Sequence, residues 1–123
     1  MWNRATIPHY FVVALILASS AQQAAGRPVI LTKTNDIEDL RSVQQAIDSL
    51  ARQAAACKSP GMACACGLRA GLDRLSAAYR AVVTKHPTWN EADVVVQYVD
   101  SQHITHATAL PNVKRQLDAC HVR

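Results

Sequence analysis

Four cysteines carry most of the chemistry that this sequence offers. They are Cys57, Cys64, Cys66 and Cys120. Thiols can bind soft metal ions, exchange with disulfides, or oxidise in pairs to form structural bridges. The compartment decides among these uses, because exported proteins meet an oxidising environment and cytosolic proteins a reducing one. The first question is therefore whether the chain carries an export signal.

Residues 1–21 contain the three parts of a secretory signal peptide. Arg4 precedes a mostly apolar run over residues 10–18, and small residues follow, with Ser19 and Ala21 at the −3 and −1 positions of a cleavage site. The apolar run is about half as long as the roughly 20 residues that a membrane-spanning helix needs. We therefore expect cleavage near Ala21 and a periplasmic or secreted protein that is not associated with the membrane afterwards.

An even number of cysteines behind such a signal predicts two disulfides. Cys64 and Cys66 are too close in the chain to bridge one another with ordinary geometry. One of them should pair with Cys57 and the other with Cys120, and we choose Cys57–Cys66 and Cys64–Cys120, with the swapped pairing as the alternative. The bridge to Cys120 closes a loop of more than 50 residues. Such a loop is worth about 4 kcal/mol in the chain-entropy treatment.

A metal site is the alternative use of the same side chains. The spacing of Cys64 and Cys66 lacks the longer gaps that are usual between paired zinc-binding cysteines, and it is not the C-x-x-C of thiol redox enzymes. Two of the histidines share a face only if their segment is helical. We therefore predict no metal and no cofactor. The alternative donors are Cys64, Cys66, His103, His106, Cys120 and His121.

Catalysis has little support in the sequence. Ser76 and Ser101 lie in no recognised nucleophile motif. The two glutamates, Glu38 and Glu91, fall at predicted helix starts in capping-box spacing with Asn35 and Thr88, so capping explains them. We expect a protein that is not an enzyme.

Aromatic residues are the best candidates for a binding surface. Trp89 follows His86-Pro87-Thr88 in a predicted loop, and a loop-borne tryptophan is a common interface anchor. Tyr98 is the second candidate. The alternative for Trp89 is a lid that packs over the end of the helical hairpin.

The spacing of apolar residues predicts the elements that must position these side chains. Steps of three and four predict helices over 36–56 and 67–86, joined as an antiparallel hairpin, and Pro111 begins a short helix over 111–119. The β-branched run Val94–Val99 favours a β-hairpin with His103–Thr108, with a helix as the alternative. The predicted fold is α+β, mainly α: a disulfide-stapled antiparallel helical hairpin with a small β-hairpin and a short C-terminal helix.

Domain organisation follows from the same reading. Gly26 and Pro28 make residues 22–33 a flexible N-terminal tail, with a short extended piece at Val29–Leu31, and residues 34–123 are expected to form a single small disulfide-bonded domain. The formal charge of +4 falls to +3 when Arg4 is lost. The basic residues are mostly interleaved with acidic ones, which argues against a nucleic-acid footprint.

The pattern from Cys57 to Cys120 resembles the LprI-type lysozyme inhibitor domains of bacterial envelopes. It consists of two cysteines with six residues between them, Cys57 and Cys64, then Leu75-x-x-x-Tyr79, then the last cysteine. It departs from that family at Ser76, where Asn is expected, and it has no Trp within 111–119. We carry over no functional residue. The resemblance illustrates a class of small exported inhibitors.

The expected function is non-catalytic binding of another envelope or secreted protein. An inhibitor, an immunity-type protein or an accessory factor all fit this description. The alternatives are a periplasmic protein that handles metals through Cys and His, and a structural component of a secretion or conjugation apparatus.

Overall fold

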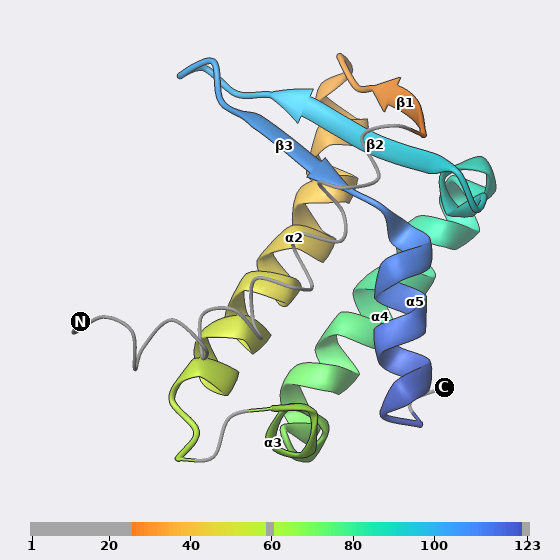
Figure 1. Cartoon of the computed structure of the whole chain (residues 1–123). Helices are drawn as coiled ribbons and strands as arrows, with labels where there is room; N and C mark the ends of the chain where they lie inside the picture. Colours follow the sequence, from red (N-terminus) through yellow and green to blue (C-terminus); the bar gives the residue numbers. More distant parts are fainter. Residues whose placement is uncertain (1–25, 59–60, 122–123) are drawn as a thin grey trace.

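The computed structural model describes residues 26–58 and 61–121, so the predicted signal peptide lies outside the described residues. The mainly α, α+β fold class is confirmed (Figure 1). Within the described ranges, none of the helices combines the length and the apolar character needed to cross a membrane. The elements in chain order are β1 (Arg27–Ile30), α2 (Thr34–Ala55), α3 (Met62–Gly67), α4 (Arg69–Lys85), the 3₁₀ helix η2 (Pro87–Asn90), β2 (Val94–Val99), β3 (Thr105–Thr108) and α5 (Leu110–Ala119).

Helices α2 and α4 form the predicted antiparallel hairpin (Figure 1). The apolar stripe of each helix enters one core, in which Leu40 and Val43 of α2 are fully buried. Gly71 of α4 lies close to α2, because a Cβ there would lie 3.0 Å from Leu50 Cδ1. α4 ends at Lys85 since the residue before Pro87 is pushed out of helical angles. The remaining core residues of the hairpin are Ala46, Ile47, Leu50, Leu72, Leu75, Tyr79 and Val82.

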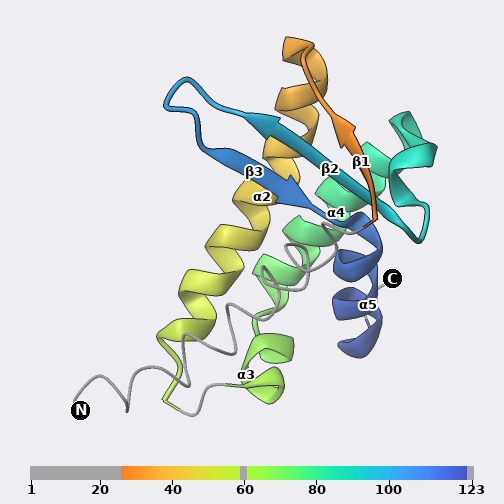
Figure 2. The same cartoon turned by 45° about the horizontal axis from the view of Figure 1, so that its top comes forward.

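The predicted β-hairpin is also present, as β2 and β3. It belongs to a three-stranded sheet in the order β1-β2-β3, which lies across one end of the helical hairpin (Figure 2). Val94, Val96 and Tyr98 alternate along β2 and point into the core shared with the helices. A two-stranded hairpin alone is marginal in water, and this third strand and the helical core supply the missing support.

The third strand corrects the expectation of a tail over residues 22–33, of which residues 26–33 are described. Arg27–Ile30 pairs in parallel with Val94–Gln97. Pro28 is tolerated because β1 is an edge strand, and Arg27 is tied down by Asp93, with Nε 2.8 Å from Oδ2. The sequence did not predict this strand, because four residues that include a proline show no clear alternating pattern. The strand with which they pair also lies more than 60 residues away in the chain.

The two predicted capping boxes are wrong. α2 begins at Thr34 with Lys33 as its N-cap, no side chain caps it, and Glu38 pairs with Arg41 instead. Thr88 lies inside the 3₁₀ turn rather than at the start of a longer helix.

The disulfide pairing we chose is wrong, and the swapped alternative is the one observed. Cys57 pairs with Cys64, and Cys66 pairs with Cys120. The reason is α3, a short helix that the sequence reading missed. Two residues apart on a helix are about 200° apart around its axis, so the two cysteines of α3 face opposite ways: Cys64 toward the end of α2 and Cys66 toward α5.

The two bridges should contribute unequally to stability. Cys66–Cys120 spans 54 residues, and Cys57–Cys64 spans 7. In the chain-entropy treatment these loops are worth about 4 and about 2 kcal/mol. We predict that C66A/C120A lowers the free energy of unfolding in urea by more than C57A/C64A does. Equal losses, or the reverse order, would show that loop length does not set the contribution of these bridges.

Candidate functional site

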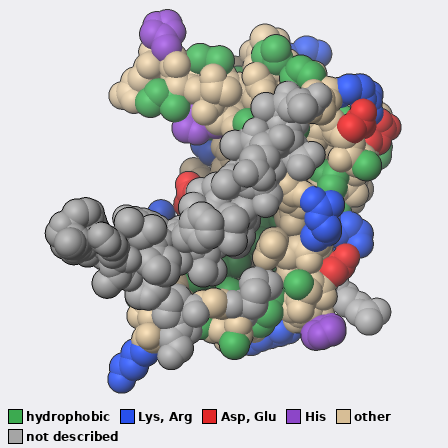
Figure 3. All heavy atoms as spheres, viewed as in Figure 1, with side chains coloured by type: hydrophobic (Ala, Val, Ile, Leu, Met, Phe, Trp, Pro, Cys, Tyr) green, Lys and Arg blue, Asp and Glu red, His purple; other side chains and the backbone are tan. Residues whose placement is uncertain are grey.

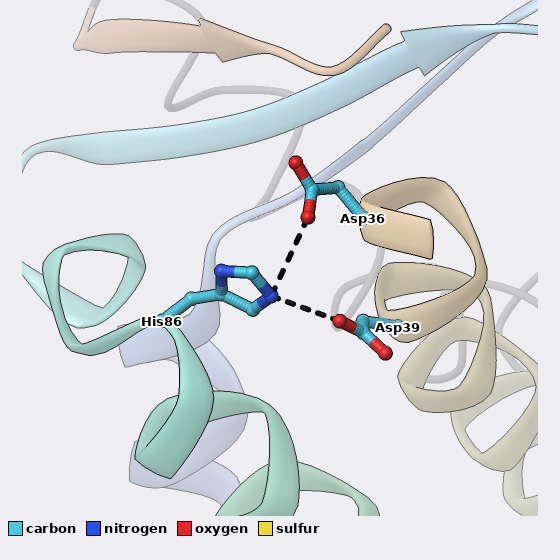
Figure 4. Close-up of side chains that lie close together, drawn as sticks. All are labelled: Asp36, Asp39 and His86. Atoms are coloured by element: carbon cyan, nitrogen blue, oxygen red, sulfur yellow. Dashed lines mark hydrogen bonds and ion pairs between the residues drawn. The ribbon is translucent and has the colours of Figure 1, made fainter. Parts of the chain in front are cut away.

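Asp36, Asp39 and His86 converge where the start of α2 meets the end of α4 (Figure 4). His86 Nε2 lies 2.9 Å from Asp39 Oδ2 and 3.8 Å from Asp36 Oδ1. All three side chains are half-buried, and one ligand atom from each lies within 4.8 Å of the other two. The cluster is the one group of at least three metal-ligating side chains found within residues 26–58 and 61–121.

Helix periodicity and the helix dipole explain why these three side chains lie together. Asp36 and Asp39 are three residues apart, so they share one face of α2. Their negative charge suits the positive end of the helix dipole, and a basic residue suits the C-terminal end of α4. His86 is the C-cap of α4. Its ring is further held by stacking on Trp89, with centroids 3.8 Å apart and planes 5° from parallel.

The electrostatics of the cluster centre on Asp39. The hydrogen bond from His86 lowers the pKa of Asp39, against the smaller opposing effect of burial, and Lys85 lowers it further. Lys85 Nζ lies 3.1 Å from Asp39 Oδ2, but the Lys85 side chain is 60% exposed. The ionised form of Asp39 is therefore favoured by two partners: the half-buried His86 and the largely exposed Lys85.

Trp89 and Tyr98, the predicted binding residues, are core residues. Only 5% of Trp89 and 4% of Tyr98 is exposed, so neither presents an aromatic face to a partner. The alternative reading of Trp89 as a lid describes its position, since it packs beside His86 at the end of the helical hairpin. Tyr98 stacks on His106, and the guanidinium of Arg41 lies over its ring.

The alternative Cys/His metal site is contradicted by the structure. Cys64, Cys66 and Cys120 are oxidised in disulfides, which removes the thiolates that would bind a metal. The histidines lie on separate features: His103 is exposed in the hairpin turn, His106 on β3 bonds to Asp100, and His121 follows α5.

The cluster at the start of α2 was missed by the sequence reading. The apolar spacing places Asp36 and Asp39 only as positions near the start of the predicted helix over 36–56, and His86 as the last residue of the predicted helix over 67–86. Nothing in the local pattern links positions almost fifty residues apart. The available signal was the antiparallel hairpin itself, because it must place the start of one helix beside the end of the other.

A second feature is an apolar end of the sheet. Ile30, Val99 and Ile104 are the large hydrophobic residues that stay exposed among those described, at 62%, 52% and 51%. In the parallel register of β1 and β2, Ile30 lies beside Gln97, two residues before Val99. Ile104 lies in the turn that follows β2, where its backbone O accepts a hydrogen bond from Asp100 N. The β2–β3 turn, which carries Ile104, projects from the helical body (Figure 1), and hydrophobic atoms are visible at the surface of this part of the molecule in Figure 3.

The third feature is a hollow of about 500 Å³ between α4 and α5. Its wall includes Arg80, Lys114 and His121, with the hydroxyl-bearing Ser76 and Tyr79. Lys114 is already paired with Asp118 at 2.8 Å. The basic side chains are thus partly neutralised, which weakens any attraction for an anion.

Asp39→Asn tests the electrostatics of the cluster. Because the folded pKa of Asp39 lies below its unfolded value, its stabilisation is present above about pH 4 and is lost as the pH falls. We predict that the substitution lowers the free energy of unfolding by about 1–2 kcal/mol at pH 7, and that the difference shrinks below pH 4. Urea unfolding between pH 3 and pH 7 measures it. Asp48→Asn, at an exposed aspartate of the same helix, is the control; equal effects of both changes would contradict the assignment.

Comparisons of the chain with protein-family models, with curated proteins and with solved structures found no match.

Proposed function

We propose that this chain is a small exported protein that binds another envelope or secreted protein, without catalysis, through the apolar tip formed by Ile30, Val99 and Ile104. The observation that carries the proposal is that the three large hydrophobic side chains left exposed among the described residues all belong to one sheet, at the ends of β1 and β2 and in the turn before β3. Single exposed hydrophobic residues need no explanation, whereas a cluster of them is typical of interaction sites.

The tip is held in shape before any partner arrives. Asp100 accepts hydrogen bonds from the backbone N–H groups of Gln102 and Ile104, at 2.8 and 3.0 Å. It is also 2.8 Å from His106 Nε2 across the hairpin. A turn that is already ordered loses less conformational entropy on binding. This arrangement supports a docking role for the tip.

The partner that suits the tip is a protein surface with an apolar groove. Val99 and Ile104 flank the turn, and Ile30 extends the patch onto the neighbouring strand. His103 and Gln102 at the turn supply a polar rim. An apolar centre with a polar rim is the usual anatomy of a protein–protein interface.

Export is supported by the cysteines. All four are paired, which is compatible with folding in an oxidising compartment such as the periplasm. The signal peptide proposed over residues 1–21 provides the route.

Substitution of the apolar tip tests the binding surface. We predict that V99T/I104T retains the melting temperature within a few degrees, because both residues are exposed, and reduces partner affinity at least tenfold. The partner is first captured from envelope extract and identified, and its affinity is then measured by calorimetry with purified protein. Ala81→Ser, at an exposed position on α4, is the matched control. Undiminished affinity of V99T/I104T would exclude the tip as the interface, and co-purification with a membrane complex would favour the apparatus component.

Intact-mass measurement tests export and oxidation together. We predict that the protein isolated from the producing cells has lost residues 1–21 and four hydrogens relative to the reduced chain. Treatment with reductant should restore the four hydrogens. A full-length chain with free thiols in the cytosolic fraction would contradict the proposed compartment and the proposed role with it.

A further inference from the structure

We propose that Asp36, Asp39 and His86 form a binding site for a divalent transition-metal ion of the Zn²⁺ class. This inference is independent of the proposed docking role, because the cluster lies between the start of α2 and the end of α4 and uses none of the three residues of the apolar tip (Figure 4). It also differs from the Cys/His site that the sequence suggested, since it uses no cysteine.

The spacing of the donor atoms suits such an ion. Zinc binds imidazole nitrogen and carboxylate oxygen at about 2.0–2.2 Å, so two ligands of a tetrahedral site are about 3.4 Å apart. The distances from His86 Nε2 to the two carboxylates are 2.9 and 3.8 Å, on either side of that value. The carboxylate oxygens of Asp36 and Asp39 lie within 4.8 Å of one another. Asp36 makes the longer of the two contacts with His86, so its side chain is the donor that must move most to share one ion with the other two.

The donor set narrows the class of metal. One imidazole and two carboxylates are borderline-to-hard ligands, which suit Zn²⁺, Mn²⁺ or Fe²⁺ better than the soft Cu⁺. Calcium needs six to eight oxygen ligands, more than the three side chains provide. Three protein ligands leave one tetrahedral position for water.

The charges of the cluster allow a metal ion to replace the ammonium of Lys85 as the partner of Asp39. To bind a metal through Nε2, the imidazole of His86 must be neutral with its proton on Nδ1. The two carboxylates and this imidazole then carry a charge of −2, which one divalent ion cancels. Without metal, Lys85 supplies part of that balance through its contact with Asp39. Because Lys85 is largely exposed, its ammonium can move into water when a metal arrives. His86 stays in place, since its ring is stacked on the buried Trp89.

This stacking also provides a spectroscopic signal. The sequence has two tryptophans, and Trp2 lies in the proposed signal peptide. Trp89 is therefore the single tryptophan of the chain cleaved after Ala21, and Trp2→Phe gives the same signal in the full-length chain. Co²⁺ bound at Nε2 would lie next to the His86 ring and quench the fluorescence of Trp89. The test uses the oxidised chain carrying Trp2→Phe, so that no thiol competes for metal. Calorimetry with Zn²⁺ gives stoichiometry and affinity, and Co²⁺ titration gives the quenching.

We expect one Zn²⁺ per chain and Co²⁺-dependent quenching of Trp89. Asp36→Asn and His86→Gln should each weaken Zn²⁺ binding at least tenfold and reduce the quenching. The matched control is D100N/H106Q, which removes an Asp–His pair of similar separation in the β-hairpin, with Nε2 2.8 Å from the carboxylate. The control should bind Zn²⁺ as the parent does.

Three results would overturn the inference: no stoichiometric Zn²⁺ binding by the parent chain, parental affinity in Asp36→Asn and His86→Gln, or loss of binding in the D100N/H106Q control. Circular dichroism of each variant confirms that it is folded. Should His86→Gln unfold, Asp36→Asn decides the matter alone, because Asp36 makes only the longer 3.8 Å contact and its removal costs the fold least.

Discussion

The packing of α2 against α4 is the constraint on which the other features of this molecule depend. A single apolar stripe on each helix aligns them antiparallel, and that alignment decides what meets at each end. At one end, Cys57 comes beside α3 and is bonded to Cys64. At the other end, Asp39 comes beside His86. A disulfide thus holds the end of the hairpin where the short connection lies. At the other end, where no connection joins the two helices, the Asp39–His86 contact holds them together.

The remaining elements cover the hairpin rather than extend it. The sheet lies across the charged end, and α5 returns along α4 to place Cys120 beside Cys66 (Figure 2). This second bridge encloses α4, the sheet hairpin and α5 in one loop. The contribution of this bridge to stability is large for a small domain, because a core of this size buries a modest apolar area. Most of the hydrophobic side chains are used in that core, which makes the exposed apolar tip stand out.

The two candidate sites differ in what holds them in place. Local hydrogen bonds around Asp100 shape the part of the apolar tip that contains Val99 and Ile104, so that part depends little on the helices. The Asp36–Asp39–His86 cluster depends on the helices entirely, since its donors come from two of them. Any change that loosens the hairpin should therefore disturb the cluster before it disturbs the tip.

The sequence by itself determined the elements with strong local signals: both long helices, the β-branched strand with its hairpin partner, and the helix that Pro111 begins. It also determined that there are two disulfides and that Cys64 and Cys66 do not bridge one another. Tertiary structure alone decided what joins distant positions. The parallel strand at Arg27–Ile30 needs β2 as its partner, the choice of bridge needs the orientation of α3, and the meeting of Asp39 with His86 needs the packed hairpin. The burial of Trp89 could not be predicted for the same reason, because the local sequence around a loop tryptophan does not show whether the side chain faces solvent or, as here, the core. Local spacing encodes backbone periodicity, whereas contacts between distant residues arise only when the apolar faces pack.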